Sequence, residues 1–152
     1  MTAVAQFGMT ANGFLAVSEE KKSRLETIFG WDFSNIKARM NVDYPSTPTH
    51  FDVLERELKR FLALSVLEPG THFFTEKADA LWHYFILHTK EYKKFCQRAF
   101  GRFLNHNPIL PGDAPKYLVA YNQTKDQYEK YFGAPPVELW GSRDVCCSGC
   151  SD

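Results

Sequence analysis

The chain has 152 residues, enough for one domain with a substantial core, and 44% of them are hydrophobic. Its 18 Lys and Arg balance 18 Asp and Glu, so no net field attracts nucleic acid or an anionic membrane. No apolar run approaches the roughly 18 residues of a membrane span, and the start of the chain shows no secretory signal pattern. These features predict a folded protein with no membrane partner.

Residues 1–16 are mostly small and polar and include glycines, and this segment is expected to be a loosely held arm. Helical patterns begin after it. Ser18 has the position of an N-cap and Gly30 that of a helix stop, so a first helix is predicted between them. Asp32 is expected to cap a short second helix that continues through Met40.

A linker at residues 44–49 precedes the clearest amphipathic helix. Thr47 and Pro48 have the character of an N-cap and a first helical residue. From Phe51 onward, apolar residues recur at intervals of three and four, until Pro69 and Gly70 end the pattern.

The next helix is expected to begin after Thr75 and to run to about Phe100. A loop at residues 105–115 follows, and within it Asp113 is expected to cap the last long helix. Gly133 then ends that helix.

No convincing strand pattern occurs, so the predicted fold class is all-α, a single compact bundle of about five helices. The bundle is expected to span residues 17–140, between the flexible arm at 1–16 and a Cys-containing tail at 141–152. Trp140 is expected to pack back on the bundle.

The segment ALWHYFILHTKEYKKFC, residues 80–96, is apolar nearly all round between residues 81 and 87, which predicts a central helix. His83 is then expected to be at least partly buried, with Asp79 four residues earlier as a partner for its ring. One interpretation is a structural Asp–His pair. Another is a metal site in which Asp79 is a ligand or orients His83.

His88 is five residues from His83, so on an unbroken helix the two side chains point about 140° apart and cannot share an ion. Sharing would require a break near Thr89. His88 does line up with Tyr92 and Cys96, but residues of these types on an apolar stripe are more typical of packing.

Three of the four cysteines crowd the last seven residues, a poor layout for a disulfide framework. This favours an intracellular, cytoplasmic protein with reduced thiols. Cys147 and Cys150 form a CxxC, half of a zinc or copper(I) site, which Cys146, Cys96 or His106 would have to complete. A redox disulfide or an inert tail remain open alternatives.

Two weaker signals occur within residues 90–102. Residues 90–102 are basic with interleaved aromatics, but a solvated helix face is favoured over a nucleic-acid patch. Cys96 with a nearby histidine would make a nucleophile and base, although a lone cysteine on an apolar face is usually inert. No phosphate-binding loop or hydrolase elbow motif occurs.

The string DALWHYFILHTKEYKKFCQRAFGRFLNHNP, residues 79–108, resembles a signature of small bacterial relatives of the glycine-rich domain-containing protein family. The resemblance is carried by Asp79, Trp82, His83, Ile86, Leu87, Thr89, Tyr92, Phe95, Cys96, Phe100, Gly101, His106 and Pro108. YEKYFGAPPVELW, residues 128–140, resembles the closing segment of these proteins, whose tails are often rich in Gly, Ser and Cys. The resemblance implies little biochemistry. Larger relatives often carry a second histidine where Phe85 stands, so a two-histidine site of their kind is not supported.

Three functional hypotheses follow. The favoured one is a non-enzymatic helical module that binds zinc or copper(I) through Cys146, Cys147 and Cys150, and separately through His83 with Asp79. The second is a protein-interaction module, phage- or defence-related, in which the histidines are structural. The third is an enzyme that uses His83 as a general base.

Overall fold

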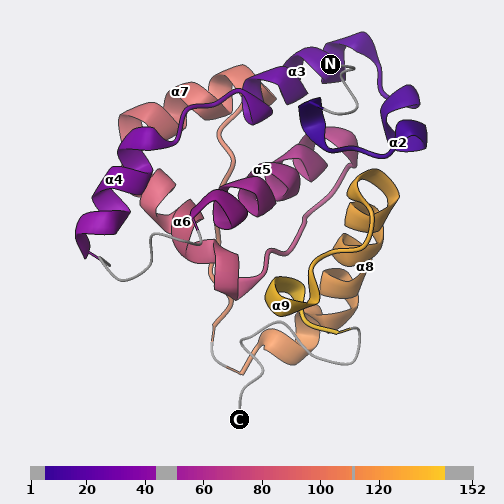
Figure 1. The fold of residues 1–152 in the computed structure, drawn as a ribbon. Coiled ribbons are helices and arrows are strands. Elements are labelled where there is room, and N and C mark those ends of the chain that lie inside the picture. The colour runs from indigo at the N-terminus through magenta and orange to yellow at the C-terminus, as the bar shows by residue number, and fades with distance from the viewer. Residues whose placement is uncertain (1–5, 44–50, 111, 143–152) are drawn as a thin grey trace.

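The computed structural model describes residues 6–43, 51–110 and 112–142, and within them the chain is helical with no strand. The helices, in chain order, are α2 (Ala11–Leu15), α3 (Glu19–Phe29), α4 (Ser34–Asp43), α5 (Phe51–Leu67), α6 (Glu76–Leu87), α7 (Thr89–Phe100), α8 (Ala114–Phe132) and α9 (Val137–Trp140) (Figure 1). The predicted all-α fold class is confirmed. Among these helices none is both long enough and apolar enough to cross a membrane.

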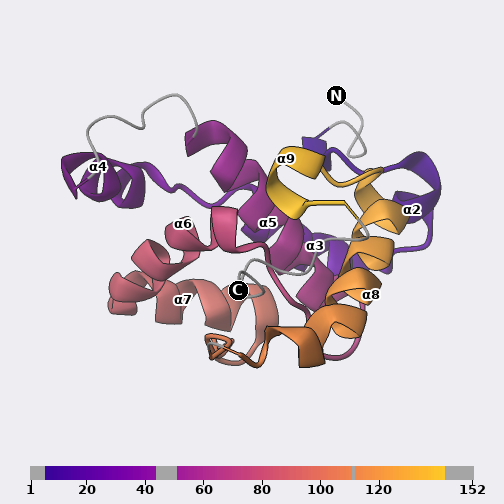
Figure 2. The same cartoon turned by 90° about the horizontal axis from the view of Figure 1, so that it is seen from below.

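α5 is the central helix of the bundle. It contacts α3, α6, α7 and α8, which surround it (Figures 1 and 2). Residues 61–64 are all buried, so α5 is covered on every side there. The sequence pattern assigns this central position to residues 76–100 instead, and that prediction is wrong, since Leu87 at the end of α6 is 73% exposed.

The first two long helices begin where their capping residues predict. The hydroxyl of Ser18 accepts a hydrogen bond from the backbone N–H of Lys21 at 3.4 Å. Asp32 accepts one from the N–H of Ser34 at 2.8 Å. These bonds satisfy N–H groups that have no partner inside the helix. α4 continues three residues beyond its predicted end, to Asp43.

The other predicted caps act differently. Thr47 and Pro48 lie outside the described residues. Thr75 precedes α6 as predicted, but its hydroxyl donates to the carbonyl of Leu139 and so ties the start of α6 to α9. Asp113 precedes α8 without a capping bond, and its carboxylate pairs with Lys116 at 2.5 Å.

The segment 6–16, predicted as a loosely held arm, packs against the bundle. Phe7 and Met9 are buried, and Phe7 stacks on Phe29 with ring centroids 5.2 Å apart. The N–H of Thr10 donates to the carbonyl of Tyr131 at 2.7 Å, which places α2 beside α8 (Figure 2). A few apolar side chains are enough to dock this short segment.

The helix predicted from residue 76 to 100 is broken at His88, which has φ −81° and ψ 60°. Nδ1 of His88 lies 2.7 Å from the carbonyl oxygen of Tyr84, the acceptor that its backbone N–H would use in an unbroken helix. That N–H donates to Phe85 instead. The imidazole thus competes with the backbone, and α7 starts in a new direction.

A buried carboxylate, Glu57, joins three helices. Its Oε2 accepts hydrogen bonds from the Tyr128 hydroxyl at 2.7 Å and from Nε1 of Trp140 at 3.1 Å. Its Oε1 lies 3.1 Å from Nε of Arg56 and 3.5 Å from Nη1 of Arg60. Trp140 is 1% exposed, which confirms that it packs back on the bundle.

Glu57→Ala should lower the free energy of unfolding by about 3–5 kcal/mol, because it leaves a buried hydroxyl and an indole N–H without their acceptor and removes the carboxylate that pairs with Arg60. Urea denaturation followed by circular dichroism measures this change. Glu19→Ala is the matched control, since Glu19 pairs with Lys22 in solvent and its loss should change stability little. Equal effects of the two substitutions would contradict the role given to Glu57.

Candidate metal centre

Asp79 and His83 lie one turn apart on α6, beside the face that the helix buries. The buried residues of that face are Ala78, Leu81, Trp82 and Phe85. A spacing of four residues makes Asp79 and His83 neighbours on the helix surface. Oδ2 of Asp79 lies 3.0 Å from Nε2 of His83. The structure therefore contains the Asp–His pair that the sequence predicts.

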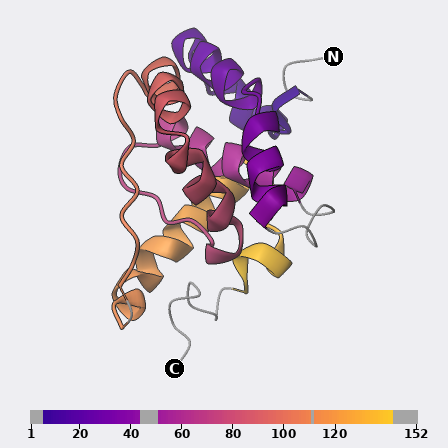
Figure 3. The same cartoon turned by 90° about the vertical axis from the view of Figure 1, so that its left-hand side faces the viewer.

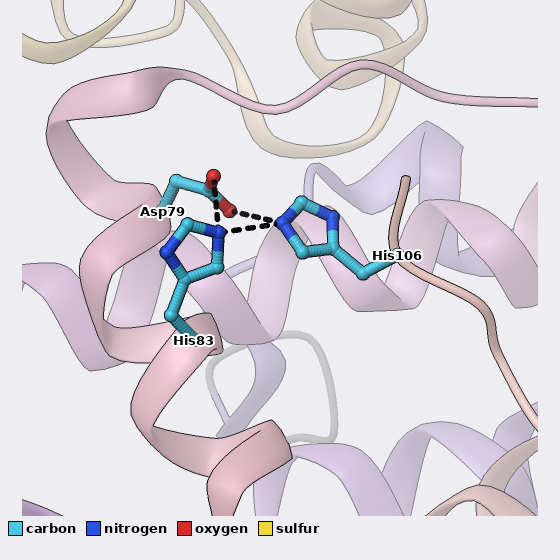
Figure 4. A group of neighbouring side chains, drawn as sticks. All are labelled: Asp79, His83 and His106. Atoms are coloured by element: carbon cyan, nitrogen blue, oxygen red, sulfur yellow. Dashed lines mark hydrogen bonds and ion pairs between the residues drawn. The ribbon is translucent and has the colours of Figure 1, made fainter. Parts of the chain in front are cut away.

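A second histidine, His106, reaches this pair from the connection between α7 and α8 (Figure 4). Its Nε2 lies 2.7 Å from Nε2 of His83 and 3.3 Å from Oδ1 of Asp79. Its ring lies against Trp82, with ring centroids 4.1 Å apart, and this contact orients the imidazole. One ligand atom from each of Asp79, His83 and His106 lies within 4.8 Å of the others.

The connection that carries His106 runs along one side of the molecule (Figure 3). Gly101 ends α7 with φ 68°, a left-handed conformation that glycine adopts without strain. Further along, the carbonyl of Leu104 accepts a 2.7 Å hydrogen bond from the Tyr92 hydroxyl, which itself accepts one from Nε1 of Trp82. Burial raises the pKa of Tyr92, so its hydroxyl remains a donor. The core thus holds this connection next to α6.

The three side chains differ in exposure. Asp79 and His106 are 18% and 15% exposed, whereas the side chain of His83 is 51% exposed. Oδ1 of Asp79 is buried and accepts no hydrogen bond, although Nε2 of His106 lies 3.3 Å away. A buried carboxylate oxygen without a donor is costly unless a cation compensates it.

These atoms carry too few hydrogens for every contact among them to be a hydrogen bond. Each Nε2 carries at most one hydrogen, and two N–H groups cannot point at each other across the 2.7 Å between His83 and His106. At most two hydrogens therefore serve the three contacts of 2.7, 3.0 and 3.3 Å, so at least one of these contacts holds no hydrogen. A metal ion would use the lone pairs of both nitrogens and of the carboxylate at once.

The separations also suit a metal. Four ligands about 2.0 Å from a tetrahedral ion lie about 3.3 Å from one another. The two imidazole nitrogens are 2.7 Å apart, and they lie 3.0 and 3.3 Å from different oxygens of Asp79, so side-chain rotations that separate the nitrogens would admit an ion. Two imidazoles and a carboxylate are a donor set that binds zinc and other divalent transition metals.

Comparison with known proteins places these residues in a family. The model of the UCP032817-like family matches residues 23–114, more than half of the chain. The chain belongs to the UCP032817-like family. Its matched segment contains Asp79, His83 and His106, so the whole candidate centre lies within the family region. No curated protein and no solved structure matches the chain.

The UCP032817-like description names no activity, ligand or partner. It also makes no reference to glycine-rich domain-containing proteins, so the resemblance to that family remains a prediction. The chemistry open to this UCP032817-like chain therefore depends on its own side chains.

His83 is more exposed than its apolar neighbours in sequence suggest, because 51% of its side chain is accessible. The expectation rests on the apolar residues that surround His83 in sequence, but Leu87 is exposed and Ile86 only partly buried. α6 is therefore buried on one face rather than all round. The less exposed imidazole of the cluster is that of His106.

The remaining candidate ligands do not join this cluster within the described residues. His88 lies at the break between α6 and α7, where its Nδ1 contacts the carbonyl of Tyr84. Cys146, Cys147 and Cys150, the predicted zinc or copper(I) ligands, lie outside the described residues and stay a prediction.

His106 is the member of the cluster that the sequence does not assign to it. Sequence reasoning offers it only as a completing ligand for the cysteines. It follows Asp79 by 27 positions, and no helical spacing links the two. The one available signal is the family-like string at residues 79–108, which contains Asp79, His83 and His106 together.

Cys96 should be unreactive in the folded protein, because burial raises the pKa of its thiol and keeps it protonated. In a variant in which Cys146, Cys147 and Cys150 are replaced by Ser, iodoacetamide at about pH 8 should leave Cys96 unmodified, as measured by intact mass. The same variant in denaturant should be fully alkylated. Rapid alkylation of the folded variant would instead support Cys96 as a nucleophile.

Proposed function

We propose that this protein is a small helical metal-binding module in which Asp79, His83 and His106 hold a divalent transition-metal ion, with zinc as the first choice. The observation that carries the proposal is the convergence of two imidazole nitrogens and a carboxylate at 2.7, 3.0 and 3.3 Å, with fewer hydrogens than contacts.

The donor set favours zinc over copper(I) at this centre. Copper(I) is a soft ion that prefers thiolates, whereas imidazole and carboxylate suit zinc and neighbouring divalent ions. The only cysteine among the described residues is Cys96, which is buried in the core rather than part of the cluster. Copper(I) binding through Cys147 and Cys150 remains a separate hypothesis about the tail.

A bound ion would also have a structural effect. Asp79 and His83 belong to α6, whereas His106 belongs to the connection between α7 and α8. A metal that bonds all three would fasten this connection to the helix. Because a ligand that binds only the folded state stabilises it, the melting temperature should rise with the concentration of free metal.

Isothermal titration calorimetry with zinc tests the proposal most directly. The protein should carry no affinity tag, and Cys146, Cys147 and Cys150 should be replaced by Ser so that the tail contributes no ligands. One zinc ion should bind per chain. His106→Ala and Asp79→Asn should each weaken binding at least about tenfold, because each removes a ligand.

His88→Asn is the matched control, since it removes an imidazole that lies outside the cluster but keeps a side-chain donor for the carbonyl of Tyr84 at the end of α6. It should bind zinc as tightly as the parent. His83→Ala should lose affinity yet keep its fold, because the side chain is half exposed. Equal binding by all variants, or none by the parent, would refute the centre. Cobalt(II) absorption in the visible range should independently report imidazole and carboxylate coordination, which the ligand variants should lose.

A further inference from the structure

A second candidate site lies beside α5, in an open cavity of about 510 Å³. The cavity is bounded by the start of the described chain, α3, α4 and α5. Its volume is in the range of sites for small metabolites. Its wall combines the stacked rings of Phe7 and Phe29 with a group of charged side chains.

The two lysines and two acids of this wall neutralise one another. Lys37 lies 2.6 Å from Glu55 and 3.3 Å from Asp52. Lys59 lies 2.7 Å from Glu55 and donates to the carbonyl of Phe29 at 3.0 Å. These groups therefore leave little unpaired charge in the cavity.

The two arginines are different. Arg56 uses its Nε to pair with Glu57, and Arg60 uses its Nη1 to contact Glu57 and the Tyr128 hydroxyl. A single carboxylate thus serves two guanidinium groups. Nε of Arg60 is buried and has no hydrogen-bond partner. A buried donor without an acceptor costs stability and calls for a water or an ion.

The guanidinium of Arg60 is held in place. Its Cζ lies 5.9 Å from the centre of the Tyr128 ring and 5.6 Å from that of Phe132. Nε and Nη2 form one edge of the guanidinium, the edge that binds two oxygens of one anion in parallel. Fixed orientation lowers the entropy cost of such binding.

Gly8 lies beside this edge and has no side chain to fill the space next to it. A Cβ added at Gly8 would lie 3.0 Å from Nη2 of Arg60 and 3.9 Å from its Nε. The backbone of Gly8 has φ 62°, a conformation that favours glycine. Any larger residue at this position would therefore crowd the free edge of Arg60.

We infer that this cavity binds the oxyanion group of a small molecule, a carboxylate or a phosphate, on the Nε–Nη2 edge of Arg60 with help from Arg56. The aromatic pair of Phe7 and Phe29 supplies an apolar wall for the rest of the ligand. The site is separate from the Asp79–His83–His106 cluster and does not depend on a metal.

Proton–nitrogen NMR of the arginine Nε–H groups tests this inference. Sodium phosphate and sodium acetate are titrated separately at constant ionic strength, and the resonance of Arg60 is assigned by its loss in Arg60→Lys. Its shift should saturate with phosphate, with acetate or with both, which identifies the oxyanion. Arg60→Lys, followed through the Nε–H resonance of Arg56, should weaken binding about tenfold or more, because it keeps the charge but removes the two-donor edge.

Two further variants separate loss of the site from loss of the fold. Gly8→Ala should weaken binding by blocking the edge, and Arg56→Gln should weaken it while leaving the core intact, since Arg56 is 49% exposed. Arg39→Gln is the matched control, because Arg39 is an exposed arginine that pairs with Asp43 away from the cavity. Shifts that never saturate, or that are the same in Arg56→Gln and Arg39→Gln, would overturn the inference.

Discussion

The fold depends on one buried carboxylate. Glu57 lies on the central helix α5, is fully buried, and draws its hydrogen bonds from α8 and α9 as well as from α5. A buried carboxylate is stable in that position only when its hydrogen-bond donors are buried beside it, so α8 and α9 must pack against α5. Trp140 does so, and the neighbouring carbonyl of Leu139 accepts the hydroxyl of Thr75 at the start of α6. The helix that carries Asp79 and His83 is thereby fixed relative to the core.

Local signals in the sequence are sufficient for much of this structure. Ser18 and Asp32 start helices through side-chain bonds that depend only on nearby residues, and the pair Asp79–His83 follows from helical geometry. The break at His88 is not predictable from apolar periodicity, because it results from an imidazole that takes the place of a backbone donor. The choice of central helix fails for a related reason: apolar content does not say which faces are covered.

The place of His106 in the cluster cannot be predicted from local sequence signals. Its contact with Asp79 and His83 requires α7 to turn back, Gly101 to end that helix, and the hydroxyl of Tyr92 to hold the following connection. None of these steps is encoded in a spacing between the three ligands. The same holds for Arg60, whose free edge is defined by Glu57, Tyr128 and Gly8 from three different parts of the chain.

The two proposed sites also differ in what they require of the chain. The cluster of Asp79, His83 and His106 lies wholly within the segment that defines the family, whereas the cavity at Arg60 needs Gly8, which precedes it. The exposure of His83 adds a chemical distinction. Structural zinc sites are closed by four protein ligands, but an ion held by these three residues would keep a coordination position on the solvent side. An open position of this kind would distinguish the proposed centre from a closed structural zinc site.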